Sequence, residues 1–156
     1  MDQMREKIEK TLEEKYFCAI ATSNNTNVDN ATVAYYSEKL NLYFGTYSDT
    51  LKGKYVKTNS QVAMCIDNIQ IHGTAHLIHN DSEEYKEYFR KYLMKFPDYK
   101  FFYEIEHEFY RVEPLVIWFY KSNMHRDKMI MDENYYQKIK PYETNSYFSK
   151  KIRPVQ

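Results

Sequence analysis

Hydroxyl and ammonium groups gather in one short stretch of the sequence, where a polar loop runs into a predicted helix. The loop spans residues 47–49, the helix is predicted over 50–59, and the side chains in question are Ser48, Thr50, Lys52 and Lys54. The first amides of a helix lack intrahelical partners, and the helix dipole leaves partial positive charge there. Hydroxyls and lysines beside those amides add charge-assisted hydrogen bonds. The stretch therefore predicts a site for a phosphate group.

The same residue types also have a plainer explanation. Ser48 or Asp49 can cap the helix while its lysines are solvated on the surface. Taken alone, such a cluster is more often a helix cap than a ligand site. The elements that surround the cluster therefore have to decide between the two interpretations.

Strands are predicted on both sides of this stretch. Alternation of apolar and polar residues predicts a strand over 40–46 before the loop and two more over 62–66 and 69–77 after the helix. Asp67 and Asn68 join the last two strands, because their side chains tolerate the positive φ of a tight hairpin turn. Two further strands, 17–22 and 28–36, precede this group. The short connections indicate antiparallel pairing.

Helices are predicted at residues 3–15 and 82–96, the second stopped by Pro97. A long strand over 109–120 contains Pro114, which indicates an edge or a bulge there, and residues 128–131 form a last strand. Six or seven strands with two or three helices, lacking strand–helix–strand alternation, predict a mainly β (α+β) fold. We expect an antiparallel barrel with the helices packed outside.

The composition narrows the classes of function. The 156 residues include 22 basic and 22 acidic ones, so no overall field attracts nucleic acid or an anionic membrane. No apolar run is long enough to span a bilayer, and residues 1–15 lack the apolar centre of a signal peptide. We therefore expect a soluble, cytoplasmic protein. Cys18 and Cys65 form no CxxC motif and are expected to be reduced core thiols.

Other clusters of chemically capable residues predict less. His72 and His76 share a face of one strand, but four residues separate them by about 13 Å, so we expect no shared metal ion. The chain contains neither GxxxxGK[ST] nor GxGxxG, which excludes those two nucleotide sites. His125, Arg126 and Lys128 form either a solvated basic loop or a group that closes over an anionic substrate. No catalytic side chain can be assigned.

Four short motifs follow one another along the predicted elements. They are Phe44-Gly45-Thr46, Thr50-Leu51-Lys52, Asn59-Ser60-Gln61-Val62 and Gly73-Thr74-Ala75. In this order they resemble the flavin-binding split barrels of the pyridoxamine 5'-phosphate oxidase-like superfamily, especially its short general-stress and nitroimidazole-reductase-like members. The resemblance covers residues 3–120. It implies an FMN-binding split-barrel domain over 1–131, followed by a tail over 132–156 that packs on the barrel or on the partner subunit.

The resemblance also implies where FMN binds. Thr50 and Lys52 match positions that hold the phosphate, and Thr46 matches one near the ribityl chain. Asn68 matches a position that reaches FMN from the other subunit. The strand segment that lies along the isoalloxazine ring consists of Ala31, Thr32, Val33 and Ala34.

Two positions depart from the pattern of the family's oxidases. Leu51 stands where they have a basic residue, so Lys54 or a cation of the partner chain has to replace that charge. Their substrate-binding Arg-x-His is absent, and the segment containing His125 and Arg126 is a loose substitute that could also reach the partner's flavin phosphate. Oxidation of pyridoxine phosphate itself is therefore not expected.

The function implied by the resemblance is that of an FMN-dependent oxidoreductase acting on a small molecule. It implies a homodimer with the flavin at the subunit interface. Two alternatives on the same fold stay open. One is a non-catalytic, stress-related protein that binds flavin, or haem through a histidine such as His72 or His125. The other is a reductase that uses the deazaflavin F420.

Overall fold

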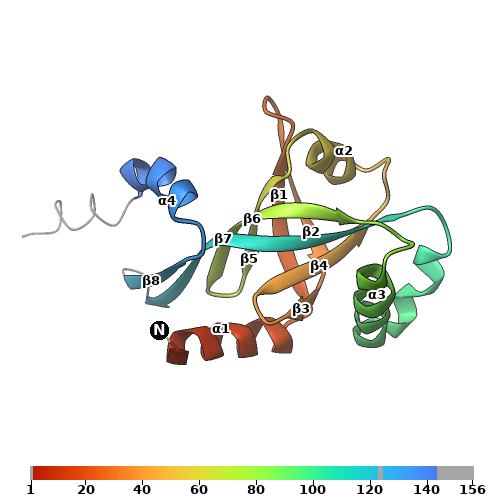
Figure 1. The fold of residues 1–156 in the computed structure, drawn as a ribbon, viewed down its shortest axis with the longest axis horizontal. Helices are drawn as coiled ribbons and strands as arrows, with labels where there is room; N and C mark the ends of the chain where they lie inside the picture. The colour runs from red at the N-terminus through yellow and green to blue at the C-terminus, as the bar shows by residue number, and fades with distance from the viewer. Residues whose placement is uncertain (1, 123–124, 144–156) are drawn as a thin grey trace, which may run out of the picture.

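The structure is a computed structural model that describes residues 2–122 and 125–143. The described residues form eight strands of one antiparallel sheet with four α-helices around it (Figure 1). The strands are β1 (Phe17–Ser23), β2 (Val28–Ala34), β3 (Tyr36–Glu38), β4 (Asn41–Thr46), β5 (Gln61–Ile66), β6 (Ile69–Ile78), β7 (Glu108–Ser122) and β8 (His125–Ile130). The helices are α1 (Asp2–Glu14), α2 (Leu51–Thr58), α3 (Glu83–Lys95) and α4 (Glu133–Ile139), with short 3-10 turns η1 (Pro97–Tyr99), η2 (Phe101–Tyr103) and η3 (Lys140–Tyr142).

The chain itself joins the two ends of the sheet. The strand order is β2-β1-β5-β6-β7-β4-β3, with β8 added to β7, and only Tyr35 separates β2 from β3. Tyr35 is fully buried and its hydroxyl donates to the Leu12 carbonyl at 2.8 Å, which interrupts the strand expected over 28–36. The sheet therefore curves into the predicted split barrel, with one strand more than the six or seven expected.

The barrel core follows the alternation on which the strand predictions depend. Every second residue of β6 from Ile69 to Ala75 is buried, and Ile8 and Leu12 of α1 add fully buried side chains to the same core. Cys18 is buried, but Cys65 is exposed. The expectation of two core thiols is wrong for Cys65, because its neighbours in β5 face inward and turn it outward.

Strand β7 links the two ends of the molecule. It pairs with β4 up to Val112 and with β8 from Val116 onward, and Pro114 lies between these two ladders. The register against β6 shifts at Gly73, which is opposite Pro114, so a residue without an N–H group stands at a bulge. The prediction for Pro114 is confirmed.

Helices cover the barrel on several sides (Figure 1). The aromatic face of α3 packs on Tyr43 and Phe109, as expected for a packing stripe. Within the region expected to be a tail, residues 133–142 form α4 and η3, and Tyr136 packs against Val116 and Trp118 of β7. In the part of the chain that is described, no helix is long and apolar enough to cross a membrane.

Candidate functional site

The loop before α2 and the first turn of that helix form a compact group of hydroxyls. Thr50 is the N-cap, and its Oγ1 accepts a hydrogen bond from the Gly53 amide at 3.2 Å. The same hydroxyl donates to the Tyr47 carbonyl at 2.8 Å and lies 2.9 Å from Oγ1 of Thr46, which is almost fully buried. The helix is thus capped, but the prediction of Ser48 or Asp49 as the cap is wrong, because Thr50 is the residue that accepts from the first turn and it lies fixed beside Thr46.

Gly53 allows the loop and the helix to lie this close together. A Cβ at this position would stand 2.5 Å from the Tyr47 carbonyl oxygen and 3.0 Å from Oγ1 of Thr50. Contacts this short to the backbone require a shift of the loop. Glycine is therefore favoured at position 53 because the loop and the first turn of α2 lie so close together.

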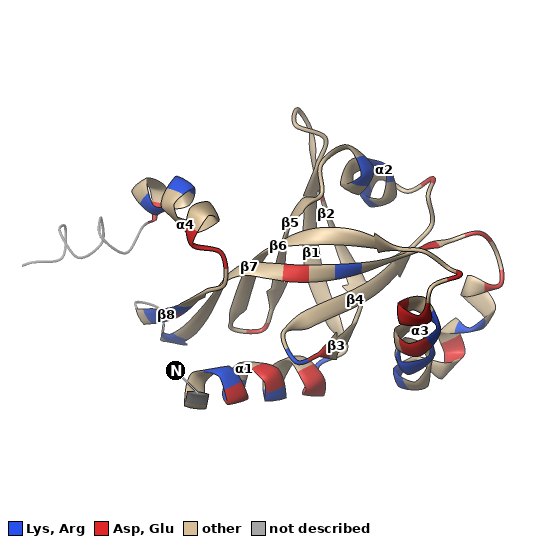
Figure 2. Cartoon of the chain, viewed as in Figure 1, with Lys and Arg blue, Asp and Glu red and all other residues tan. Residues whose placement is uncertain are grey.

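The two lysines of the first turn are available for a ligand. Within the described residues, the ammonium groups of Lys52 and Lys54 form no hydrogen bond or ion pair, whereas Lys57 pairs with Glu108 at 2.5 Å. The helix carries no acidic residue, as Figure 2 also shows. Positive charge near a helix start, with no internal partner, favours the binding of an anion. Leu51, which departs from the basic residue of the oxidases that the sequence resembles, is 53% exposed.

Strand β2 contributes an edge to the same region, since α2 packs against β1 and β2. Among the described strands, β2 pairs with β1 alone. Val33 and Ala34 are buried in the core, Thr32 is exposed and Ala31 is half-buried. Of the four residues predicted to lie along a flavin ring, Thr32 is therefore the one with an exposed side chain.

The predicted site residue Asn68 lies elsewhere. Its side-chain amide donates to the Tyr120 carbonyl at 3.0 Å, and its own carbonyl accepts from the Tyr120 amide at 2.9 Å. The preceding Asp67 has a φ of 53°, as expected for the hairpin turn. Asn68 therefore ties the β5–β6 hairpin to the far end of β7.

The predicted site is divided between two ends of the molecule. Thr46 pairs with Glu108 at the start of β7, and Asn68 contacts Tyr120 near its end. At about 3.3 Å per residue, twelve residues of strand separate these points by roughly 40 Å. Figure 1 likewise shows α2 well apart from the β8–α4 region. A single chain does not bring the two groups together.

His125 and Arg126 lie in β8, at the Asn68 end. His125 is exposed, and Arg126 has a side chain that is 10% exposed. The Arg126 guanidinium stacks over Trp118 at 5.0 Å and donates to the Tyr120 hydroxyl at 2.9 Å. It also forms an ion pair with Glu143 at 3.7 Å. Arg126 is therefore engaged within its own chain.

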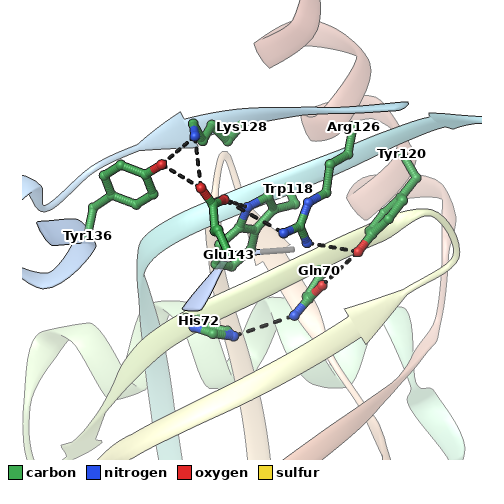
Figure 3. Close-up of polar contacts among 8 residues, drawn as sticks. All are labelled: Gln70, His72, Trp118, Tyr120, Arg126, Lys128, Tyr136 and Glu143. Atoms are coloured by element: carbon green, nitrogen blue, oxygen red, sulfur yellow. Dashed lines mark hydrogen bonds and ion pairs between the residues drawn. The ribbon is translucent and has the colours of Figure 1, made fainter. Parts of the chain in front are cut away.

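Sequence reasoning missed the carboxylate at the centre of this second group (Figure 3). Glu143 accepts hydrogen bonds from Trp118 at 2.7 Å, from Tyr136 at 2.5 Å and from Lys128 at 3.0 Å. Burial alone would raise the pKa of its carboxyl, but the three donors outweigh burial and lower that pKa to about 2. The feature of the sequence that could have pointed to this group is the spacing of two cations, Arg126 and Lys128. They lie two residues apart on the strand that pairs with the only tryptophan.

The histidines of β6 have partners of their own. His72 lies 2.8 Å from the Tyr135 hydroxyl and packs edge-on against Trp118, and burial together with the charge of Arg126 lowers its pKa. His76 lies 3.2 Å from the Glu113 carboxylate. Across residues 2–122 and 125–143, no group of three or more His, Cys, Asp or Glu side chains is arranged to hold a metal ion.

The sequence also matches a known protein family. The family model described as pyridoxamine 5'-phosphate oxidase matches residues 4–119. No curated protein sequence matches the chain.

Solved structures with low sequence identity share the fold. General stress protein 26 from Bacillus anthracis str. Sterne is 15% identical, with a TM-score of 0.64 over 83% of this chain and 99% of that one. A FAD-binding protein from Mesorhizobium loti is 13% identical, with a TM-score of 0.57 over 69% and 87%. The heme storage protein HutZ from Vibrio cholerae is 10% identical, with a TM-score of 0.63 over 80% and 92%.

Proposed function

Because the chain belongs to the pyridoxamine 5'-phosphate oxidase family, a family that binds flavins, we propose that it is an FMN-dependent oxidoreductase acting on a small molecule. One observation carries the proposal. The start of α2 combines two fixed threonine hydroxyls with two lysines that have no partner in the described residues. A flavin monophosphate brings the anion that this arrangement lacks.

The phosphate would be held by groups that the fold already positions. The amides of Leu51 and Lys52 have no intrahelical acceptor, since Gly53 and Lys54 already bond to Thr50. The Lys52 and Lys54 ammonium groups add charge-assisted hydrogen bonds to the phosphate oxygens. Lys54 supplies the second charge where Leu51 replaces the basic residue of the family's oxidases.

Bound FMN would supply the electron transfer, and the protein would bind and orient it. Edge strand β2 offers the flat side of the ring its backbone and the exposed side chain of Thr32, while Ala31 is half-buried. The proposal needs no side chain that acts as a general acid or base.

A second copy of the chain would complete the site. Asn68 and His125 lie roughly 40 Å from Thr46 along β7, so they can meet the same flavin only from a partner subunit. The side-chain nitrogen of Asn68 already donates to the Tyr120 carbonyl, which leaves the side-chain oxygen Oδ1 for such a contact. We therefore propose a homodimer with two flavins bound between the subunits. We also propose that the protein acts in the cytoplasm.

The absorption spectrum of the purified protein and its uptake of added FMN test this proposal. We expect a yellow protein, and Lys52→Ala should weaken FMN binding about tenfold to hundredfold, because a charge-assisted hydrogen bond contributes about 1.5–3 kcal/mol. Lys86→Ala, which removes an exposed lysine of α3, should leave FMN binding unchanged. A colourless protein that takes up no FMN contradicts the proposal.

A non-catalytic haem-binding protein is the second candidate. It is favoured by the exposed His125 and by the fold shared with a heme storage protein. Added haemin would then give a Soret band that His125→Ala removes, with no uptake of FMN. Competition between FMN and F420 separates the deazaflavin alternative from the first proposal.

A further inference from the structure

A pocket of about 420 Å³ lies between the end of α1, the short strand β3 and the second half of α3. Both helices pack on β3, and Figure 1 shows them next to that strand. The volume lies within the range of small-molecule sites. The described residues that line the pocket come from these three elements and from the connection between α1 and β1. The pocket is therefore separate from the proposed phosphate site at α2.

Lys95, at the end of α3, holds its ammonium group among neutral partners. The nitrogen lies 4.5 Å from the centre of the Tyr35 ring, 5.1 Å from that of Tyr16 and 5.6 Å from that of Phe96. It also donates a hydrogen bond to the Lys15 carbonyl. Ring faces and a carbonyl attract a cation, and they fix its position. None of these partners carries a negative charge.

The ammonium of Lys95 therefore lacks an anion. Within the described residues it forms no ion pair, and the Lys15 carbonyl uses one of its three N–H groups. Burial lowers the pKa of Lys95 to about 8, while the smaller effects of Cys18 on β1 and Glu13 on α1 oppose this shift. The charged form is thus poorly solvated, and an anion that reaches the two remaining N–H groups gains free energy.

Lys91, one turn earlier on α3, provides the contrast. It lines the same pocket, but its ammonium lies 3.4 Å from the Glu87 carboxylate and 3.8 Å from that of Glu38. The charge of Lys91 is balanced within the chain, whereas the charge of Lys95 is available to a ligand.

The other walls of the pocket suit an aromatic ring. Tyr16 is 54% exposed and Met94 is 69% exposed, and Tyr36 lines the pocket beside them. A ring that covers these side chains removes apolar surface from water. The exposed Glu13 adds one negative charge to the lining, so a singly charged ligand is favoured over a dianion.

We propose that this pocket binds a small aromatic carboxylate. The ring packs on Tyr16, Tyr36 and Met94, and the carboxylate pairs with the ammonium of Lys95. The site shares neither its residues nor its ligand with the proposed flavin site, so either proposal can fail without the other.

Benzoate is the probe, and the Cε signal of Lys95 in protein with ¹³C-labelled lysine reports the charge of its ammonium. Benzoate should shift this signal saturably and raise the pH at which it titrates, because the ligand binds the charged form. Acetate, which has no ring, and benzyl alcohol, which has no charge, should each bind at least about tenfold more weakly.

The pH dependence of binding identifies the lysine. The affinity for benzoate should fall about tenfold from pH 7 to pH 9, since the charged fraction of a lysine with a pKa of about 8 falls from about nine tenths to about one tenth. A lysine with the ordinary pKa of 10.5 stays charged over this range. The neighbouring Cys18, Tyr35 and Tyr36 stay neutral, because burial raises the pKa of each. This measurement uses the wild type, so it does not depend on whether a variant folds.

Two matched variants compare the lysines. Lys95→Gln should weaken benzoate binding about tenfold to hundredfold and remove its dependence on pH. Lys91→Gln, in the same pocket, should change the affinity by less than about threefold, because its charge is already balanced.

Three results would overturn the proposal. The first is a Lys95 signal that does not respond to benzoate. The second is an affinity that is equal at pH 7 and pH 9, or that falls equally in the two lysine variants, which makes the response one of general positive charge. The third is binding of acetate or inorganic phosphate as tight as that of benzoate, which contradicts the assignment of the pocket to aromatic carboxylates.

Discussion

The two ends of the barrel use positive charge in opposite ways. At the α2 end, Lys52 and Lys54 meet no internal anion, and the helix start beside them is preformed. At the β8–α4 end, Arg126 and Lys128 share one internal carboxylate, and the Arg126 side chain is 10% exposed. A buried cation requires a partner before any ligand arrives, whereas an exposed one does not. The first end is therefore open to a ligand, whereas the cations of the second already hold an anion of their own chain.

The largest expected effect tests whether the buried end is a coupled network. Arg126→Ala should lower the free energy of unfolding by about 3 kcal/mol, because it breaks a buried ion pair and leaves Trp118 and Tyr120 without their stacked cation. Lys121→Ala removes an exposed ion pair of the same hairpin and should lower it by about 0.5 kcal/mol or less. Urea unfolding curves measure both. Equal losses would remove the contrast between buried and exposed charge.

The pH dependence of stability tests the charge at the buried end. The folded pKa of Glu143 is about 2, below the ordinary 4.5 of a glutamate, so its stabilising effect is complete above pH 4.5 and is lost as the pH falls towards 2. Between pH 4.5 and pH 3 the wild type should lose about 2 kcal/mol more than Glu143→Gln, at about 1.4 kcal/mol per pH unit. Urea unfolding at each pH measures this difference. If the free energies of unfolding of the two proteins change in parallel with pH, the donors around Glu143 do not lower the pKa of its carboxyl.

The same contrast explains how far the sequence could predict the molecule. The α2 end is local in sequence: the helix start and the hairpin at Asp67 lie within one short stretch, so residue types and spacing predicted both elements, although the cap is Thr50 and not Ser48 or Asp49. The β8–α4 end depends on Glu143 meeting Trp118, 25 residues away, through a helix that follows no strong periodicity. No local pattern encodes such a contact.

Burial explains the remaining differences from the sequence predictions. Tyr35 ends β2 because its ring enters the core and bonds to Leu12, and Cys65 faces outward because Met64 and Ile66 beside it face inward. Both outcomes are set by which side of a strand meets the barrel interior. An apolar run without clear alternation leaves that side undetermined.

The smallest expected effect separates binding from stability at the open end. Thr50→Ala and Ser82→Ala each remove a hydroxyl N-cap, of α2 and of α3, and each should lower the free energy of unfolding by about 1 kcal/mol. Only Thr50→Ala should also weaken FMN binding, by about threefold to tenfold, since only that cap lies beside the proposed phosphate site. Equal loss of FMN affinity in both variants would mean that affinity follows global stability. Loss in Thr50→Ala alone would mean that the cap is also part of the ligand site, because two caps of matched chemistry would then differ only in what lies next to them.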